Sequence, residues 1–160
     1  MKTTLILPTY NEAENLPRLI PALLEQDIAG LRLLIVDDKS PDGTGQIAEE
    51  LARRYPGRIE VMHREGPPGL GRAYVAGFDH VLDTDAEVIG QMDSDFSHPT
   101  EKVPEMLAKL ENCDIALGSR YIPGGGVDRH WPLWRKALSR WGNFHARSIL
   151  GLPVKDVTGG

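Results

Sequence analysis

Short apolar runs alternate along the chain with longer segments in which apolar residues recur every three or four positions. The runs have the length and composition of β-strands, and the longer segments have the period of amphipathic α-helices. The predicted strands are 4–7, 32–36, 58–62, 87–92 and 114–117. The predicted helices are one that opens at Asn11, followed by 42–53, 71–82 and 100–110. This alternation predicts an α/β fold, a Rossmann-like, mostly parallel sheet flanked by helices on both faces.

Two of the predicted helices begin at residues suited to capping. Asn11 is followed three positions later by Glu14, the spacing of a capping box, and an apolar stripe begins at Leu16. Asp42 precedes the second helix and is expected to cap it.

Composition narrows the class of protein. A chain of 160 residues, 41% apolar and 26% charged, has the size and content of one soluble globular domain, so 1–160 is expected to form a single domain. The net charge of −5 argues against general nucleic-acid binding. Cys113 has no cysteine partner, and no stretch is long and apolar enough to span a membrane, so a cytoplasmic protein is expected.

Asp93 and Asp95 lie one residue apart directly after the apolar run 87–92. Carboxylates at this spacing after a strand can converge on one divalent cation, and hard oxygen ligands suit Mg²⁺ or Mn²⁺. Such cations commonly take one or two protein carboxylates and leave the remaining positions to phosphate oxygens and water. The pair predicts a metal-diphosphate site; the alternative is two solvated carboxylates in a surface turn.

Two more polar clusters follow predicted strands. Residues 8–12 (PTYNE) come after the first strand, and Asp37 and Asp38 end the second. Because the carboxyl ends of parallel strands meet at one edge of a sheet, these clusters are expected to lie beside the carboxylate pair. An aspartate after the second strand can hold a ribose or base, and Tyr10 can cover a base. The alternative for the two aspartates is strand-ending turn chemistry.

Two further features allow phosphate binding. The stretch 66–73 (GPPGLGRA) resembles a phosphate-cradling loop at a helix N-terminus, although it lacks the Walker and dinucleotide signatures; the alternative is a tight turn. Arg120 follows the fifth predicted strand, where its guanidinium can neutralise diphosphate charge; the alternative is an ordinary surface arginine.

The segment 131–149 is basic and aromatic in a chain that is otherwise acidic. All three tryptophans, Trp131, Trp134 and Trp141, recur there at helical spacing, and no acidic residue occurs from Arg129 through Val154. Such a helix can lie at a membrane interface, with its rings at headgroup depth. A core-packing helix with a solvated basic face is the alternative. The membrane interpretation predicts peripheral attachment to the cytoplasmic face of a membrane.

Six sequence blocks together resemble one known family. They are 8–12 (PTYNE), 36–44 (VDDKSPDGT), 69–71 (GLG), 91–99 (QMDSDFSHP), 118–121 (GSRY) and 156–160 (DVTGG). Covering the chain in order, they resemble the polyprenyl-phosphate hexosyltransferases of the GT-A, family-2 glycosyltransferase class, and within it the dolichyl-phosphate mannose synthases. The blocks at 37–44 and 92–99 are the most specific for this subgroup.

The resemblance implies roles for individual residues. The nucleotide sugar would be held by Pro8, Tyr10, Glu12, Val36, Asp38, Asp93, Ser94, Asp95 and Arg120. The metal would be held by Asp93, Asp95 and Ser97, and the acceptor phosphate by Arg135 and Ser139. The catalytic residues would be Asp95, Arg120 and Arg135. In this interpretation 1–121 binds the nucleotide sugar, and 122–160 supplies a loop and the helix that faces acceptor and membrane.

The activity that the resemblance implies is metal-dependent, inverting transfer of a hexosyl group, mannose from GDP-mannose being favoured, to dolichyl or polyprenyl phosphate. A phosphate monoester is already anionic at neutral pH, so the acceptor needs no dedicated general base. The protein would align the acceptor phosphate behind the anomeric carbon and stabilise the leaving nucleoside diphosphate.

Two positions depart from the family pattern. Ser97 stands where some relatives have Gln, and Thr158 is followed by Gly159 and Gly160 where the family usually reads Ser-Gly-Phe. Family members continue beyond this point, so we expect a C-terminally truncated chain that lacks a membrane-anchor segment or a partner.

Several alternatives stay open. The donor can be UDP-glucose or another nucleotide sugar. The acceptor can be a hydroxyl, which would require a carboxylate base, and Asp156 is the candidate. A sugar-1-phosphate nucleotidyltransferase would use a similar sheet but release pyrophosphate. The non-enzymatic alternative is a truncated, membrane-attached nucleotide-binding fragment.

Overall fold

Nine helices and strands are assigned in the residues that the computed structural model describes, which are 1–122, 132–151 and 154–157. In chain order they are β1 (Thr3–Thr9), α1 (Leu16–Leu24), β2 (Leu31–Asp37), α2 (Thr44–Arg54), β3 (Ile59–His63), α3 (Leu70–Leu82), β4 (Val88–Gln91), α4 (Lys102–Lys109) and α5 (Leu133–Leu150). The chain forms two compact units, Met1–Glu105 and Met106–Gly160. Each unit is described by itself.

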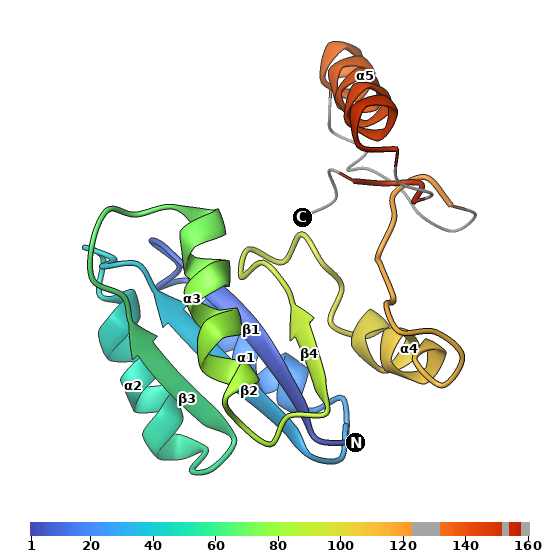
Figure 1. Ribbon diagram of the computed structural model, residues 1–160. Coiled ribbons are helices and arrows are strands. Elements are labelled where there is room, and N and C mark those ends of the chain that lie inside the picture. The colour runs from blue at the N-terminus through green and yellow to red at the C-terminus, as the bar shows by residue number, and fades with distance from the viewer. Residues whose placement is uncertain (123–131, 152–153, 158–160) are drawn as a thin grey trace. The chain divides into compact units, whose positions relative to one another are not determined.

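The first unit is built on a four-stranded sheet in the order β3-β2-β1-β4 (Figure 1). Each neighbouring pair is parallel, with Thr9 opposite Asp37 and Ile6 opposite Gln91. The predicted α/β fold with a parallel sheet is therefore confirmed. Since all four strands run the same way, the loops that follow them leave from one edge, and the strand order reverses between β1 and β4.

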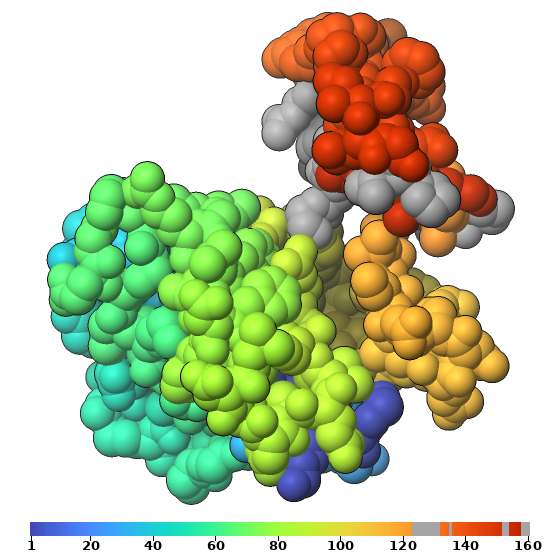
Figure 2. All heavy atoms as spheres, viewed as in Figure 1, coloured from blue at the N-terminus to red at the C-terminus, as the bar shows by residue number. Residues whose placement is uncertain are grey.

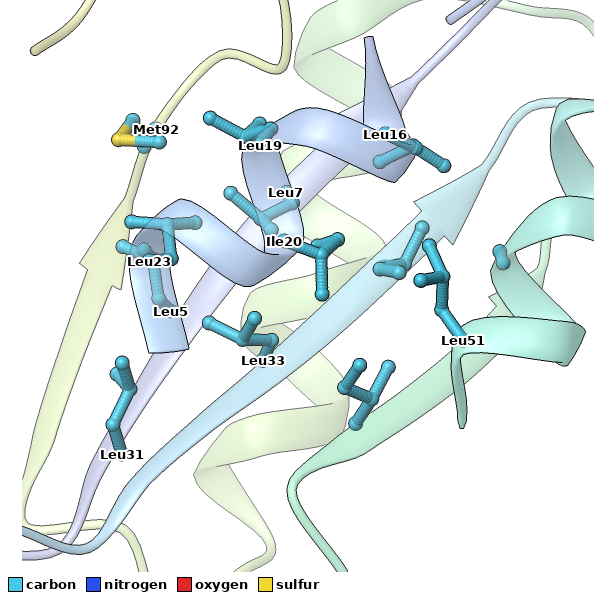
Figure 3. Close-up of a cluster of buried hydrophobic side chains, with 13 residues drawn as sticks. Leu5, Leu7, Leu16, Leu19, Ile20, Leu23, Leu31, Leu33, Leu51 and Met92 are labelled. Atoms are coloured by element: carbon cyan, nitrogen blue, oxygen red, sulfur yellow. The ribbon is translucent and has the colours of Figure 1, made fainter. Parts of the chain in front are cut away.

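Helices cover both faces of this sheet. Alternate residues of β1 and β2 point to opposite sides, because side chains alternate along a strand. Leu5, Leu7, Leu33 and Ile35 pack with the leucines of α1 and with α2 (Figure 3). Ile6, Leu34 and Val36 pack on the other face against α3. Burial on both faces explains why β1 and β2 are nearly continuous apolar runs.

The predicted fifth strand is wrong. Residues 114–117 form no strand, and the side chains of Ile115 and Leu117 are 73% and 58% exposed. The short apolar run is present, but a strand exists only when its backbone groups pair with a neighbour. Consequently Arg120 does not follow a strand end as predicted.

Two predicted helix starts are also displaced. α1 begins at Leu16 rather than Asn11, because residues 11–13 use their N–H groups to bond side chains of the β2–α2 loop. α2 begins at Thr44 with Gly43 as its cap residue. Asp42 lies one position earlier than a cap, yet its Oδ1 accepts the backbone N–H of Thr44 at 3.0 Å. It satisfies a free N–H of the first turn, as a capping residue would.

The second unit contains α5, which covers most of the predicted basic, aromatic segment. Several large apolar side chains of α5 are exposed, namely Leu133, Trp134, Leu138, Trp141 and Phe144. Figure 2 draws the atoms of α5 as orange to red spheres. Trp131 lies outside the described residues. Among the described residues, no helix combines the length and hydropathy needed to cross a membrane.

We expect Gly77→Ala to destabilise the first unit. A Cβ at position 77 of α3 would lie 2.6 Å from Cγ2 of Ile6, a methyl group fixed on a central strand. Overpacking of this kind costs about 1–3 kcal/mol, which outweighs the gain of up to about 1 kcal/mol from replacing glycine in a helix. Thermal or urea unfolding monitored by circular dichroism measures the change.

Gly71→Ala is the matched control for this substitution. Gly71 lies on the same helix, and a Cβ there meets no atom within 4 Å. It is expected to leave stability unchanged or slightly raised; equal effects of the two substitutions would refute the close-packing explanation.

Candidate functional site

The candidate site lies where β1 and β4 stop pairing. The ladder between them ends at Ile6 and Gln91, and the next backbone bond runs from Met92 N–H to the Ile6 carbonyl. Pro8 is the next residue of β1 whose backbone faces that side, and it has no N–H to continue the ladder. Its carbonyl instead accepts the hydroxyl of Ser94 at 2.9 Å. The loop carrying the aspartate pair is thus tied to the end of the central strand.

The loops after β1, β2 and β4 each hold one non-glycine residue in the left-handed region. Asn11 has φ 61°, Lys39 has φ 58° and Phe96 has φ 61°. This conformation is uncommon for residues with a side chain and is most often found where surrounding contacts enforce it, as at binding sites. Arg18 of α1 lies over the ring of Phe96, 5.1 Å from its centroid, and holds that side chain.

Three successive N–H groups after β1 are bonded by side chains of the β2–α2 loop and of the first residue of α2. Asn11 donates to Ser40 Oγ (3.1 Å), Glu12 to Thr44 Oγ1 (2.8 Å) and Ala13 to Asp42 Oδ2 (3.1 Å). Ser40 in turn donates to buried Asp37 at 2.6 Å. The hydroxyl of Thr44 donates to Asp42, and this bond holds the pKa of Asp42 below its usual value. These bonds fix the main chain beside Tyr10, whose side chain is 51% exposed.

Asp38 links the end of β2 to the loop before α3. Its Oδ2 accepts the N–H of Gly69 at 2.6 Å, and its Oδ1 lies 2.5 Å from Nη2 of Arg64, an ion pair without hydrogen-bond geometry. Asp38 is 5% exposed and the Arg64 side chain 12%. The predicted phosphate cradle at 66–73 therefore already holds a carboxylate of the protein at the start of its helix. For Gly69, the tight-turn alternative therefore fits the structure better than the phosphate-binding interpretation.

Asp93 and Asp95 follow β4 at the same edge. Asp93 is partly buried, and its Oδ1 accepts the hydroxyl of Tyr74 on α3 at 2.7 Å. Burial, this hydrogen bond and the charges of the two aspartates raise the pKa of Tyr74 well above its usual value, so Tyr74 remains a donor. Partial burial raises the pKa of Asp95, but hydrogen bonds from Ser97 outweigh it, and the net pKa is lowered.

The residues of this loop fit a hard divalent cation. Asp93 and Asp95 offer carboxylate oxygens, the hard ligands that such a cation prefers. In the part of the chain that the structure describes, three or more histidine, cysteine or acidic side chains do not gather in metal-binding geometry. A cation here would therefore complete its coordination with other oxygens, which is the usual behaviour of Mg²⁺ with diphosphates.

The other residues of the first unit that are predicted to bind the nucleotide sugar or the metal differ in which atoms are available to a ligand. Pro8 and Val36 have buried side chains, so they can present only backbone atoms to a ligand. Glu12 accepts a hydrogen bond from the side chain of Asn15 at 2.6 Å. Ser97 donates its backbone N–H to Asp95 at 2.9 Å, and its hydroxyl lies 3.0 Å from Nδ1 of His98.

In the second unit, partly exposed Arg120 forms an ion pair with buried Asp156. Arg120 donates from Nε to Oδ2 at 2.8 Å and from Nη2 to Oδ1 at 3.0 Å, and its backbone N–H also bonds Oδ2. The side chain of Asp156 is fully buried. Asn143 on α5 holds the flanking backbone, since it bonds the carbonyl of Lys155 and the N–H of Val157.

The predicted acceptor residues also belong to this unit. Ser139 on α5 has its hydroxyl 3.0 Å from that of Tyr121. Arg135 lies on α5, and its side chain is outside the described residues.

Four residues at the carboxyl edge have no role in the sequence-based predictions. Ser40 and Thr44 lie inside the block 36–44, and their spacing from Asp42 is a signal for loop bonding. Arg64 directly follows β3, so the strand-end rule could have placed it. Tyr74 lies one turn inside α3, and nothing in the sequence pattern marks it.

The family model described as "Glycosyl transferase family 2" matches residues 4–160. The chain belongs to this family. It is 46% identical over 160 residues to a Mycolicibacterium smegmatis protein named polyprenol monophosphomannose synthase, covering 99% of this chain and 60% of that protein. It is 42% identical over 164 residues to an undecaprenyl-phosphate mannosyltransferase of Micrococcus luteus, covering 100% and 65%. It is 40% identical over 161 residues to a dolichol-phosphate mannosyltransferase of Pyrococcus furiosus, covering 98% and 43%.

Solved structures share the fold. Residues 1–349 of TarS from S. aureus match with a TM-score of 0.57 and 27% identity, over 69% of this chain and 32% of that chain. The same TarS segment in complex with UDP-GlcNAc matches with a TM-score of 0.53 and 29% identity, over 69% and 31%. This chain spans between 43% and 65% of the length of the three relatives named above.

Asp42→Ala is expected to loosen the loop of this family-2 domain that carries Tyr10. The substitution removes the acceptor for the Ala13 N–H and the partner of Thr44. Hydrogen exchange at Ala13 should accelerate by roughly tenfold, the effect of losing one hydrogen bond. Exchange measured by mass spectrometry or NMR tests this.

Glu50→Ala serves as the control because it removes an exposed carboxylate from α2. It should leave the exchange of residues 11–13 unchanged. Unchanged exchange in Asp42→Ala would mean that the loop does not depend on this carboxylate.

Proposed function

We propose that the protein transfers mannose from GDP-mannose to a dolichyl or polyprenyl phosphate, with inversion at the anomeric carbon. The observation that carries this proposal is the similarity to three relatives named as polyprenyl- or dolichyl-phosphate mannosyl-transfer enzymes. Each matches 98% or more of this chain at 40–46% identity. The aspartate pair and the loops at the β1–β4 switch point support the proposal, because such switch points are where open α/β sheets bind ligands.

The donor would bind across the carboxyl edge of the sheet. Exposed Tyr10 is available to cover the base. Pro8 and Val36 are paired near the ends of β1 and β2, and their backbone atoms would contact the nucleotide. Both oxygens of Asp38 are engaged, but each carboxylate oxygen can accept more than one hydrogen bond, so a ribose hydroxyl can share them. The TarS complex with UDP-GlcNAc supports a nucleotide-sugar donor for this fold.

Asp93 and Asp95, with Ser97 beside them, would hold Mg²⁺ or Mn²⁺ against the donor diphosphate. A cation bound there neutralises charge that develops on the leaving nucleoside diphosphate. Ser94 keeps this loop on β1, and hydrogen bonds from Ser97 lower the pKa of Asp95.

The acceptor side needs orientation rather than a base. A phosphate monoester is a nucleophile without deprotonation by the protein, so the task is to bring it into line with the anomeric carbon. Arg120, Arg135 and Ser139 would bind phosphate oxygens. Asp156 would set the plane of the Arg120 guanidinium through its two-point contact.

The same contact weighs against the hydroxyl-acceptor alternative. That reaction would require Asp156 as general base, with an oxygen facing the acceptor. Asp156 is fully buried at its side chain and bonded at both oxygens by Arg120.

The α5 helix would rest on a membrane surface. Exposed Trp134, Leu138 and Trp141 stand on a helix that also carries Arg140 and Arg147, in a chain whose net charge is −5. Aromatic rings at headgroup depth and cations near anionic phosphates stabilise such a helix. This placement would bring the enzyme to its lipid acceptor from the cytoplasmic face.

Calorimetry should show metal-dependent binding of GDP-mannose by the wild-type chain, with UDP-glucose bound more weakly. Asp95→Asn should lower the Mn²⁺-dependent affinity by about tenfold or more, because it removes a charged ligand. Asp79→Asn, an exposed change on α3, should match the wild type. Preference for UDP-glucose would overturn the mannosyl assignment, and unchanged affinity in Asp95→Asn would overturn the role of this residue.

Vesicle flotation tests the membrane role of α5. The wild-type chain should float with vesicles containing phosphatidylglycerol, and the double variant Trp134→Ser, Trp141→Ser should bind roughly tenfold more weakly. Leu82→Ser, which changes an exposed apolar residue of α3, is the control and should bind like the wild type. Equal flotation of wild type and double variant would exclude α5 as the contact surface.

A further inference from the structure

Tyr74 connects α3 to the metal-binding loop through one hydrogen bond. Its hydroxyl donates to Oδ1 of Asp93 at 2.7 Å, across 19 positions of sequence. The rest of the Tyr74 side chain packs against the cluster formed by Ile6, Leu34, Val36, Ala73 and Val81. The ring is therefore held by the core of the first unit, and only its hydroxyl reaches the site.

This hydrogen bond makes the two carboxylate oxygens of Asp93 different. Oδ1 is engaged by Tyr74, whereas no residue in the described part of the chain hydrogen bonds to Oδ2. A hydrogen bond to one oxygen fixes the rotation of a carboxylate and leaves the other oxygen in a defined direction. Groups that orient ligands in this way are a regular feature of metal sites, and their removal typically costs 10–100-fold in metal affinity or activity.

We propose that Tyr74 is a positioning residue that holds the Asp93 carboxylate so that Oδ2 faces the divalent cation. This inference rests on the proposed function, because it assumes that Asp93 binds a metal with a nucleoside diphosphate. It assigns to α3 a part in the site besides covering the sheet.

The main chain of the loop is held independently of Tyr74. Ser94 bonds the Pro8 carbonyl, and Met92 N–H bonds the Ile6 carbonyl. Loss of the Tyr74 hydroxyl should therefore release the side chain of Asp93 and leave the loop in place. Tyr74→Phe keeps the packed ring and removes only the hydrogen bond, so it isolates the proposed role.

The test is Mn²⁺ binding to the 160-residue chain in the presence of GDP, followed by the electron paramagnetic resonance signal of free Mn²⁺. Tyr74→Phe should weaken Mn²⁺ binding by about tenfold. GDP affinity measured with chelator and the melting temperature should stay near the wild-type values. Tyr55→Phe, which removes a tyrosine hydroxyl at the end of α2, should bind Mn²⁺ like the wild type.

A double-mutant cycle separates positioning from a general structural effect. If Tyr74 acts through Asp93, Tyr74→Phe should have no further effect on Mn²⁺ binding in an Asp93→Asn background. A merely structural role would lower affinity equally in both backgrounds, and that result would overturn the proposal.

A second measurement covers the case in which Tyr74→Phe does not fold. With 3-fluorotyrosine at position 74, the fluorine resonance should shift when Mg²⁺ and GDP are added, and this shift should be lost in Asp93→Asn. An unshifted resonance would overturn the proposal.

The outcomes distinguish this inference from the proposed function. A wild-type chain that binds no Mn²⁺ with GDP overturns the metal assignment and this inference together. Wild-type binding that persists unchanged in folded Tyr74→Phe overturns this inference alone.

Discussion

The candidate site depends on the point at which β1 loses β4 as a partner. β1 is the central strand, and all seven of its residues are buried, so its position is fixed from both faces and both sides. Pro8 has no N–H to offer where the ladder to β4 would continue, and its carbonyl takes the Ser94 hydroxyl instead. The chain after β4 therefore diverges from β1 but remains attached to it. The aspartate pair is presented on a loop whose origin is as rigid as the sheet.

Side-chain hydrogen bonds organise the loops beyond the strands. Ser40, Asp42 and Thr44 take the place that a neighbouring strand would occupy, since each accepts an N–H from residues 11–13. Such bonds compensate for the left-handed conformations of Asn11 and Lys39, which are costly by themselves. The specific block at 36–44 is thereby explained in large part by structure: three of its polar residues hold the loop that carries Tyr10.

Charge is placed differently in the two units. In the first unit, buried Asp38 is balanced by Arg64 and by the start of α3, while the aspartate pair lies at the carboxyl edge with Asp93 bonded by Tyr74. In the second unit, a basic helix carries the exposed aromatic side chains, and Arg120 is paired with buried Asp156. A carboxylate pair suits a cation with diphosphate, and a basic aromatic helix suits an anionic lipid surface. Both features are consistent with the proposed transfer from a soluble nucleotide sugar to a lipid phosphate.

The sequence by itself determined the parallel α/β fold, the position of four strands and the aspartate pair at the end of the last of them, because periodicity and strand-end chemistry are local properties. It did not determine whether 114–117 would find a strand partner, where α1 begins, or what Asp38 and Asp156 contact, since pairing depends on segments far apart in the chain. Tyr74 shows the difference most clearly. The apolar periodicity of the sequence identifies Tyr74 only as a helix residue. Its hydrogen bond to Asp93 exists because α3 packs against the sheet next to β4.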